Sequence, residues 1–242
     1  MQNWPANKQL LNQLAVVQVV NSRELSPEFD GGHLDWLSDS ELARYQAITS
    51  SPRKSQFLAG HYLVRKMASR VFNNSLHHWT YYQDAGGLRR LKCNEDSLPE
   101  LYVSISHSGD WIAAAISNVP IGIDIETFSK QRDFIAIASH VFSAAEISYL
   151  KSCNAQELKQ NFYLYWTLKE SAAKQYGLGL KFEVSRLQSP VLVSDIERAH
   201  MQTWQCQDYV IALASEVSTP VETFGLNENA KHQSWKNINS CQ

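Results

Sequence analysis

Apolar and polar residues alternate along the first half of this chain with the periods of strands and helices. Residues 14–20, LAVVQVV, are dense in valine, which predicts a strand. Residues 38–49 predict a helix, with Ser38 as its N-cap and Glu41 at the third helical position. Residues 53–72 place apolar side chains three and four apart, which predicts a second, longer helix.

A hairpin and a further strand follow a turn-rich stretch. We expect strands over Leu101–Ser106 and Trp111–Ser117, joined by a tip at His107–Asp110. After a turn at Asn118–Pro120, the segment IGIDIE predicts a strand over Ile121–Glu126.

The remaining pattern is again helix and then strand. Ser143 and Glu146 form the signature of a capped helix start at residues 142–151, and residues 157–177 predict a long helix that glycines end. Strand-like segments close the pattern at residues 182–188, 200–206 and 209–215.

A weak internal repeat indicates two similar halves. GDWIAAAIS at residues 109–117 resembles QDYVIALAS at residues 207–215, and each closes a half that contains one long helix. We therefore expect an α+β fold, with an N-terminal half at 1–117, a C-terminal half at 118–215 and a polar tail at 216–242. A chance likeness between two apolar strands is the alternative.

Composition narrows the class of protein. The 242 residues are 44% hydrophobic and 19% charged, with a net charge of −2, which is unlike the basic footprint of a nucleic-acid binder. No apolar run approaches the roughly 20 residues that span a bilayer, and the N-terminus has no secretory pattern. The four cysteines are scattered without metal-ligand spacing, so we expect reduced thiols, no zinc and a cytoplasmic protein.

Carboxylates and lysines form the first candidate site. In IGIDIE, Asp124 and Glu126 share one face of the strand, which is either a solvated face or a place where a cation compensates two negative charges. Trp166, Glu170 and Lys174 lie four residues apart on a helix that is apolar nearly all round. A solvated Glu–Lys pair is one interpretation, and three carboxylates around a hard cation such as Mg²⁺ is the other.

The segment SISHSGD adds a second candidate. Ser106 and His107 are expected at the exposed hairpin tip, where a histidine is usually without function. Beside a basic region such as Arg53-Lys54, it could instead help to hold a phosphate.

Four segments in this order resemble one family. RKSQFLAGHYLVR, SISHSGDW, GIDIE and WTLKESAAK together resemble the 4′-phosphopantetheinyl transferases of the surfactin-synthetase (Sfp) type, over roughly residues 40–215. The resemblance implies a pseudo-dimer of two α+β halves with the active site between them. It also implies a monomeric enzyme that moves the phosphopantetheine arm of coenzyme A to a serine of an acyl or peptidyl carrier protein and releases 3′,5′-adenosine bisphosphate.

The resemblance implies roles for single residues. Asp124, Glu126 and Glu170 would hold Mg²⁺ on the pyrophosphate, and Glu170 is also the candidate base for the acceptor serine. Lys174 would bind the phosphate that develops charge. Arg53, Ser106 and His107 would contact coenzyme A. For His107 and Arg53, the contact would be with the 3′-phosphate.

Two departures from the family pattern and two alternative functions remain open. His61 stands where the family often has arginine, and the family's Gly-Lys-Pro loop is replaced by GGLRRLKC, in which Arg89 or Arg90 could substitute. The alternatives are a metal-dependent phosphohydrolase and a non-catalytic protein that binds carrier protein or coenzyme A. The segment 127–142, with Lys130 and Arg132, is the expected docking surface for an acidic carrier protein, and an ordinary loop followed by a core helix is the alternative.

Overall fold

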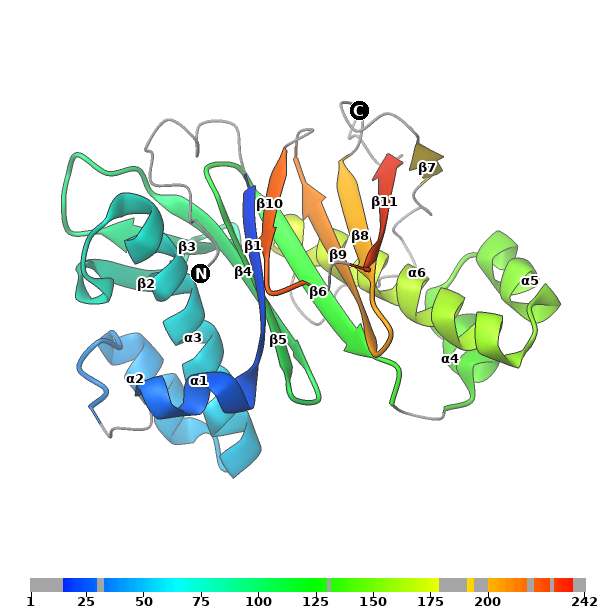
Figure 1. The fold of residues 1–242 in the computed structure, drawn as a ribbon, viewed down its shortest axis with the longest axis horizontal. Coiled ribbons are helices and arrows are strands. Elements are labelled where there is room, and N and C mark those ends of the chain that lie inside the picture. The colour runs from blue at the N-terminus through cyan, green and yellow to red at the C-terminus, as the bar shows by residue number, and fades with distance from the viewer. Residues whose placement is uncertain are drawn as a thin grey trace.

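Strands of the chain form two sheets with helices on their outer sides (Figure 1). The computed structural model describes residues 15–29, 33–129, 132–178, 191–193, 200–216, 220–226 and 229–236. The strand predicted at 182–188, Lys130 and Gly179 lie outside these residues. Within the described parts of the chain, no helix is long and apolar enough to cross a membrane.

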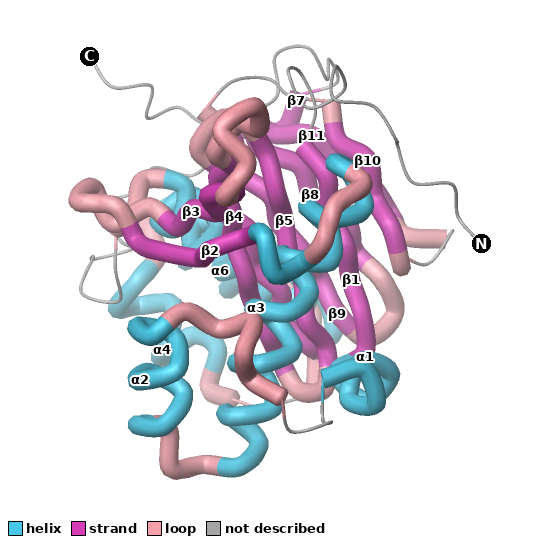
Figure 2. Tube along the Cα trace, turned by 90° about the vertical axis from the view of Figure 1, so that its left-hand side faces the viewer, coloured by secondary structure: helices cyan, strands magenta, loops and turns pink. Residues whose placement is uncertain are grey.

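The first half of the chain builds a sheet with α3 (Ser51–Phe72) packed on one face. Its strand order, among the described residues, is β10-β1-β5-β4-β3-β2. Figure 2 shows α1, α2 and α3 grouped on the same side of this sheet. The other elements are β1 (Ala15–Asn21), α1 (Ser22–Phe29), α2 (Asp39–Ala47), a 3₁₀ turn (Leu76–His78), β2 (Trp79–Gln83), β3 (Arg89–Cys93), β4 (Leu101–Ser108) and β5 (Trp111–Ser117).

The second half builds the other sheet, and α6 (Ala155–Gln175) covers its outer face. The strand order here, in the part that the structure describes, is β6-β9-β8-β11-β7. The other elements are β6 (Ile121–Thr127), α4 (Phe134–Val141), α5 (Ala144–Ser152), β7 (Val191–Val193), β8 (Met201–Gln205), β9 (Tyr209–Ser215), β10 (Val221–Phe224) and β11 (Lys231–Lys236).

The strand pairing confirms the two similar halves. β1 pairs antiparallel with β5, which also pairs with β4, and the long helix α3 lies between β1 and this hairpin in sequence. In the same way β6 pairs antiparallel with β9, which also pairs with β8, and α6 lies between them in sequence. The two segments that looked alike in sequence are β5 and β9, which occupy equivalent places.

Capping residues set the helix starts. Ser38 and Glu41 form a reciprocal capping box on α2, and Ser143 and Glu146 form one on α5, as the sequence predicted. A third box, formed by Asn154 and Glu157, starts α6 at Ala155, two residues earlier than predicted.

Two segments of the expected polar tail after residue 215 form strands. β10 pairs parallel with β1, so the chain returns to the first half. β11 pairs with β8 and β7, and its Trp235 is buried with its indole N–H donating to Thr203. β10 is the edge strand of its sheet, so one of its sides faces solvent, whereas β11 lies between β8 and β7.

A third apolar cluster fills the space between the two sheets. Ile121, Ile123 and Ile125 of β6 meet Val17 and Val19 of β1 there. This leaves the alternate residues of β6, which include Gly122 and both carboxylates, on the face toward α6 and β4. The isoleucine face therefore fixes the direction in which the acidic residues point.

Gly122 lets α6 approach β6 without an intervening side chain. A Cβ atom at this position would clash with the carbonyl oxygen of Ser171 and lie 2.5 Å from the backbone nitrogen of Gln175. Because both are backbone atoms of a helix, the contact cannot be relieved by rotating a side chain.

We predict that Gly122→Ala lowers the free energy of unfolding by about 2–3 kcal/mol, because the added methyl overpacks this contact. Thermal denaturation followed by circular dichroism measures the change. Gly86→Ala is the matched control, since its Cβ would meet its nearest neighbouring atom at 3.4 Å. Equal melting temperatures for the two variants would contradict this account of the packing.

Candidate active site

Serine hydroxyls join β4 to β6 along the line where the two sheets meet. Ser104, Ser106 and Ser108 lie on one face of β4, because side chains alternate along a strand. The backbone N–H of Ile123 donates to Ser104 Oγ at 2.9 Å. Ser108 Oγ accepts the N–H of Thr127 at 3.1 Å. We call this line of contacts the β4–β6 seam.

The same hydroxyls orient the two carboxylates of β6. Ser106 Oγ donates to Asp124 Oδ1 at 2.7 Å, and Ser108 Oγ donates to Glu126 Oε2 at 2.9 Å. Hydrogen bonds to ionised acceptors are stronger than neutral ones. The predicted placement of Asp124 and Glu126 on one face is confirmed, and that face is a buried seam rather than a solvated surface.

Lys174 reaches this seam from α6. Its Nζ lies 2.7 Å from Asp124 Oδ1 and 3.0 Å from the carbonyl oxygen of Ile123. Asp124 Oδ2, by contrast, is buried and has no hydrogen-bond partner in the described part of the protein. An unpartnered carboxylate oxygen in a buried position is costly, and a cation at this place would relieve the cost.

Glu170 lies one helical turn before Lys174 and feels the same charges. Burial raises the pKa of Glu170, and the carboxylates of Asp124 and Glu126 raise it further while Lys174 opposes them. The charges of the three acids are thus coupled. Across the described residues, however, no three histidine, cysteine or acidic side chains are already arranged as a metal cluster.

The donor chemistry nevertheless fits Mg²⁺. This ion usually keeps several waters and takes one or two carboxylates together with substrate phosphates. Asp124 offers one free oxygen, and Glu126 and Glu170 lie within electrostatic reach. A preformed cage of three carboxylates is not required for such a site.

His107 belongs to β4 and not to the predicted tip. It pairs with Ile112 of β5, so the tip consists of Gly109 and Asp110, with Gly109 at a φ of 58°. The prediction was wrong because the polar run His107-Ser108 looks like a turn, whereas Ser108 is held in the strand by its contacts with β6.

His107 lies near several charged groups. Partial burial of its ring lowers the pKa of His107, and the positive charges of Lys174 and Arg53 lower it further, while Asp124 opposes them. Arg53, from the predicted basic region, and Lys174 are thus close enough to act on the pKa of His107. Together they form a positive region beside the seam.

A small pocket opens at the end of the seam nearest Lys174. Its volume is about 150 Å³, and Arg89 from β3 and Tyr81 from β2 line it together with Lys174. Arg90 points elsewhere: its guanidinium stacks 4.0 Å from the ring of Tyr102 and lies 3.2 Å from Glu100. Of the two arginines left open by the sequence, Arg89 is the one beside the site.

Two glycines bring this pocket together. Gly87 in the β2–β3 turn and Gly177 after α6 both have positive φ values, of 87° and 68°. A Cβ on Gly177 would lie 2.5 Å from the carbonyl oxygen of Gly86, so the two turns touch backbone to backbone. The sequence could not predict this contact, because it joins residues that are about 90 positions apart.

Comparison with known proteins decides the family. The model of the 4′-phosphopantetheinyl transferase superfamily matches residues 120–223. A 4′-phosphopantetheinyl transferase named Sfp from Bacillus subtilis (strain 168) is 30% identical over 167 residues, which cover 69% of this chain and 72% of that protein. The chain belongs to this family.

Two further relatives agree. A Bacillus subtilis 4′-phosphopantetheinyl transferase named ffp is 42% identical over 167 residues, covering 69% of this chain and 72% of the relative. Another from Bacillus subtilis is 43% identical over 84 residues, covering 35% of this chain and 37% of the relative. These transferases move phosphopantetheine from coenzyme A to carrier proteins, so the family resemblance and the enzyme class predicted from the sequence are confirmed.

His61 does not reach the site of this 4′-phosphopantetheinyl transferase family member. It is 5% exposed, with Nδ1 at 2.6 Å from Glu41, whose other oxygen lies 2.6 Å from Arg65. Burial lowers the pKa of His61 and Glu41 opposes this. Burial would raise the pKa of Glu41, but hydrogen bonds from His61 and Arg65 bring it down to about 2. The Nδ1 atom of the buried His61 ring is thus engaged by Glu41.

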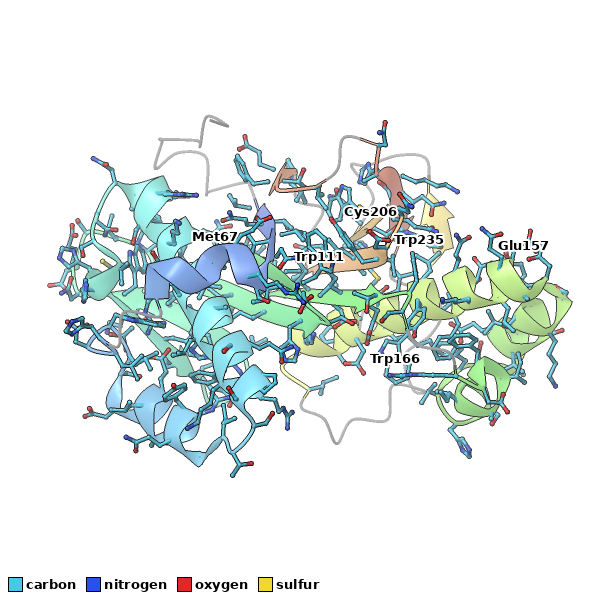
Figure 3. The ribbon with its side chains drawn as sticks, turned by 60° about the horizontal axis from the view of Figure 1, so that its bottom comes forward. Met67, Trp111, Glu157, Trp166, Cys206 and Trp235 are labelled. Atoms are coloured by element: carbon cyan, nitrogen blue, oxygen red, sulfur yellow. The ribbon has the colours of Figure 1, made fainter. Side chains whose placement is uncertain are left out.

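Lys169 and Trp166 also act away from the carboxylates. Lys169 Nζ lies 3.0 Å from Glu146, and both side chains are almost fully buried. Because Glu146 also caps α5, this ion pair fixes the start of α5 against α6. Trp166 stacks on Phe162 on the side of α6 toward α4 (Figure 3). On α6, Glu170 and Lys174 are the residues placed at the β4–β6 seam.

Proposed function

We propose that this chain carries out the family's reaction with Asp124, Glu126 and Glu170 holding Mg²⁺ on the pyrophosphate of coenzyme A. The observation that carries the proposal is the seam itself. The hydroxyl of Ser106 and the Nζ of Lys174 hold one oxygen of Asp124, while the other is buried without a partner among the described groups. A bound Mg²⁺ would neutralise charge that develops on the phosphates.

The transfer is a displacement at phosphorus. The hydroxyl oxygen of the carrier serine forms a bond to the phosphorus that bears pantetheine. The bond from this phosphorus to the bridging oxygen breaks, and its electron pair leaves with 3′,5′-adenosine bisphosphate. The serine proton passes to a base, directly or through water.

Glu170 is our candidate for that base. Burial and the neighbouring acids raise its pKa, which makes its carboxylate a better proton acceptor. Its place beside Asp124 would also let it share the metal. Both roles need the carboxylate close to the reacting phosphate.

Positive groups would hold the remaining phosphates. Lys174 is the candidate for the leaving diphosphate, since phosphoryl transfer is mainly positioning and charge neutralisation. His107 and Arg53 are the candidates for the 3′-phosphate, and their mutual electrostatic effect supports a common ligand. Ser106 would orient Asp124 through its hydrogen bond and would lie beside the bound coenzyme A.

The cysteines and the origin of the site residues bear on the cellular compartment and on the oligomeric state. Cys93, Cys153 and Cys206 are free thiols, which supports a reducing, cytoplasmic compartment. The site draws residues from both halves of one chain, so a monomer would suffice.

We predict that an apo carrier protein incubated with this chain, coenzyme A and Mg²⁺ gains the mass of one phosphopantetheine arm. Intact-mass spectrometry of apo acyl and peptidyl carrier proteins measures the gain. Asp124→Ala or Glu170→Ala should abolish it, because the metal loses a ligand, while the apolar clusters that form the core of each half are unchanged. Asp39→Ala, an exposed acid on α2, is the matched control and should transfer normally. Full activity of Asp124→Ala at low Mg²⁺ would refute the metal assignment.

The carrier protein would dock on segment 127–142, which leaves the seam directly after Glu126. Arg132 is exposed, and Lys130 lies outside the described residues. Burial raises the pKa of Tyr163, the charge of Arg132 lowers it and that of Glu126 raises it, so both charges act on the same side chain. A basic surface there suits the acidic carrier proteins that the family resemblance implies.

We predict that Lys130→Glu with Arg132→Glu raises the Michaelis constant for carrier protein by up to about tenfold and weakens its salt dependence. The constant for coenzyme A should stay the same. Steady-state kinetics at two ionic strengths measure both constants. Arg70→Glu, at the far end of α3, is the control. If the carrier constant does not change, the carrier docks on another surface.

A further inference from the structure

A cluster of buried polar side chains joins α2 and α3 behind the small pocket. Glu41 on α2 lies at its centre, with Oε2 at 2.6 Å from Arg65 and Oε1 at 2.6 Å from Nδ1 of His61. Arg65 also donates to the carbonyl oxygen of Trp79 at 3.0 Å, which ties α3 to β2. We call Glu41, His61 and Arg65 the buried cluster.

The protonation states of the buried cluster fix the direction of its hydrogen bonds. Glu41 is ionised near neutral pH, because its pKa is about 2. Burial lowers the pKa of His61, and the charges of Arg65 and Arg44 lower it further while Glu41 opposes them. The imidazole is therefore neutral near pH 7, and its Nδ1–H donates to Glu41. This hydrogen bond fixes the orientation of the ring.

The second half contains the same ion pair without a histidine. Glu146, like the glutamate of the buried cluster, is the third residue of a capped helix and pairs with a cation of the long helix, Lys169. The position four residues before that cation is Tyr165, where the first half has His61. Glu146 Oε1 is buried without a hydrogen-bond partner among the described groups. The capped helix is thus held without a histidine, which points to a different role for His61.

The ring of His61 lies between two aromatic rings. It stacks on Phe57 at 4.0 Å, and the ring of Tyr81 lies 4.3 Å away on β2. Tyr81 is buried, and it also lines the small pocket together with Arg89 and Lys174. The oriented imidazole therefore gives Tyr81 a rigid support on the side away from this pocket.

Tyr81 and Arg89 lie on the same face of the β2–β3 hairpin. Tyr81 pairs with Leu91, two residues after Arg89, so the two side chains are diagonal neighbours. Burial raises the pKa of Tyr81, while the charge of Arg89 and a hydrogen bond from it lower this pKa. Arg89 Nη1 also donates to the carbonyl oxygen of Gly87 at 2.9 Å. The guanidinium is thus held by the hydroxyl of Tyr81 and by the turn.

We propose that Tyr81 and His61 are positioning residues, with Tyr81 holding Arg89 beside Lys174 in the small pocket and His61 holding Tyr81. Two positive groups that line one pocket repel each other, so an unsupported arginine side chain would turn away into solvent. An arginine that is already ordered loses less conformational entropy when it binds a phosphate. The inference rests on the proposed function, in which positive groups hold the phosphates of the substrate.

The first test removes only the hydroxyl that meets Arg89. Tyr81→Phe keeps the ring against His61, and we expect it to weaken the binding of coenzyme A about three- to tenfold. The Michaelis constant for coenzyme A should rise by the same factor, while kcat should stay the same because Lys174 and the carboxylates are unchanged. Isothermal titration calorimetry and steady-state kinetics measure these quantities.

Tyr82→Phe is the matched control. Tyr82 is the next residue of β2 and lies on the opposite face, where its hydroxyl donates to Glu100 at 2.9 Å. This variant also loses one tyrosine hydroxyl, and its affinity for coenzyme A should equal that of the wild type. Equal losses in Tyr81→Phe and Tyr82→Phe, or no loss in Tyr81→Phe, would overturn the inference.

A double-mutant cycle separates positioning from a general loss of stability. Arg89→Ala should weaken the binding of coenzyme A about tenfold, and adding Tyr81→Phe to it should cause no further loss. His61→Ala should weaken binding by a smaller factor than Tyr81→Phe, and again only while Arg89 is present. Circular dichroism establishes that each variant is folded at the temperature of the titration. Losses that persist in the Arg89→Ala background would show a structural role only.

A spectroscopic readout tests the contact without reference to activity. In protein labelled with ¹³C at tyrosine Cζ, Tyr81→Phe identifies the resonance of Tyr81. Arg89→Ala should shift this resonance, whereas Arg90→Ala, on the opposite face of β3, should not. An unshifted resonance in Arg89→Ala would refute the contact. Absence of phosphopantetheine transfer by the wild-type chain would instead refute the proposed function, whatever the resonance does.

Discussion

The contact on which the site depends is a row of serine hydroxyls between two strands of different sheets. Within a sheet, neighbouring strands satisfy each other's backbone groups, but β4 and β6 belong to separate sheets in the described structure. Ser104, Ser106 and Ser108 satisfy the backbone and the acids of β6 instead. A hydrogen bond to a charged group contributes about 1.5–3 kcal/mol, so the seam both joins the halves and orients Asp124 and Glu126. The acids are therefore part of the interface between the halves.

Helix α6 completes the site because the second half brings it unusually close to β6. Gly122 removes the side chain that would keep the two apart, and Lys174 then reaches Asp124 at 2.7 Å. Another face of α6 is held by the buried pair of Lys169 and Glu146. Adjacent residues 169 and 170 thus serve different purposes. A helix rotates by about 100° per residue, so successive side chains point in different directions.

Local patterns in the sequence predicted much of this arrangement. Alternation in IGIDIE placed the isoleucines on one face and the acids on the other, and capping residues marked two helix starts correctly. Contacts between distant segments could not be predicted in the same way. The burial of His61 depends on Glu41 and Arg65, the extension of β4 through His107 depends on β6, and the place of Arg89 depends on Gly177. The polar sequence of β11 does not predict a strand. The segment forms one because it pairs with β8 and β7.

The central claim is that the seam hydroxyls hold the carboxylates in the orientation that binds Mg²⁺ together with coenzyme A. The most direct test is the affinity for coenzyme A, measured by calorimetry with and without Mg²⁺, in the wild type and in the variant Ser106→Ala with Ser108→Ala. We expect Mg²⁺ to increase the affinity of the wild type, and we expect most of this increase to be lost in the variant while its metal-free affinity stays similar. An equal increase in both proteins would contradict the account.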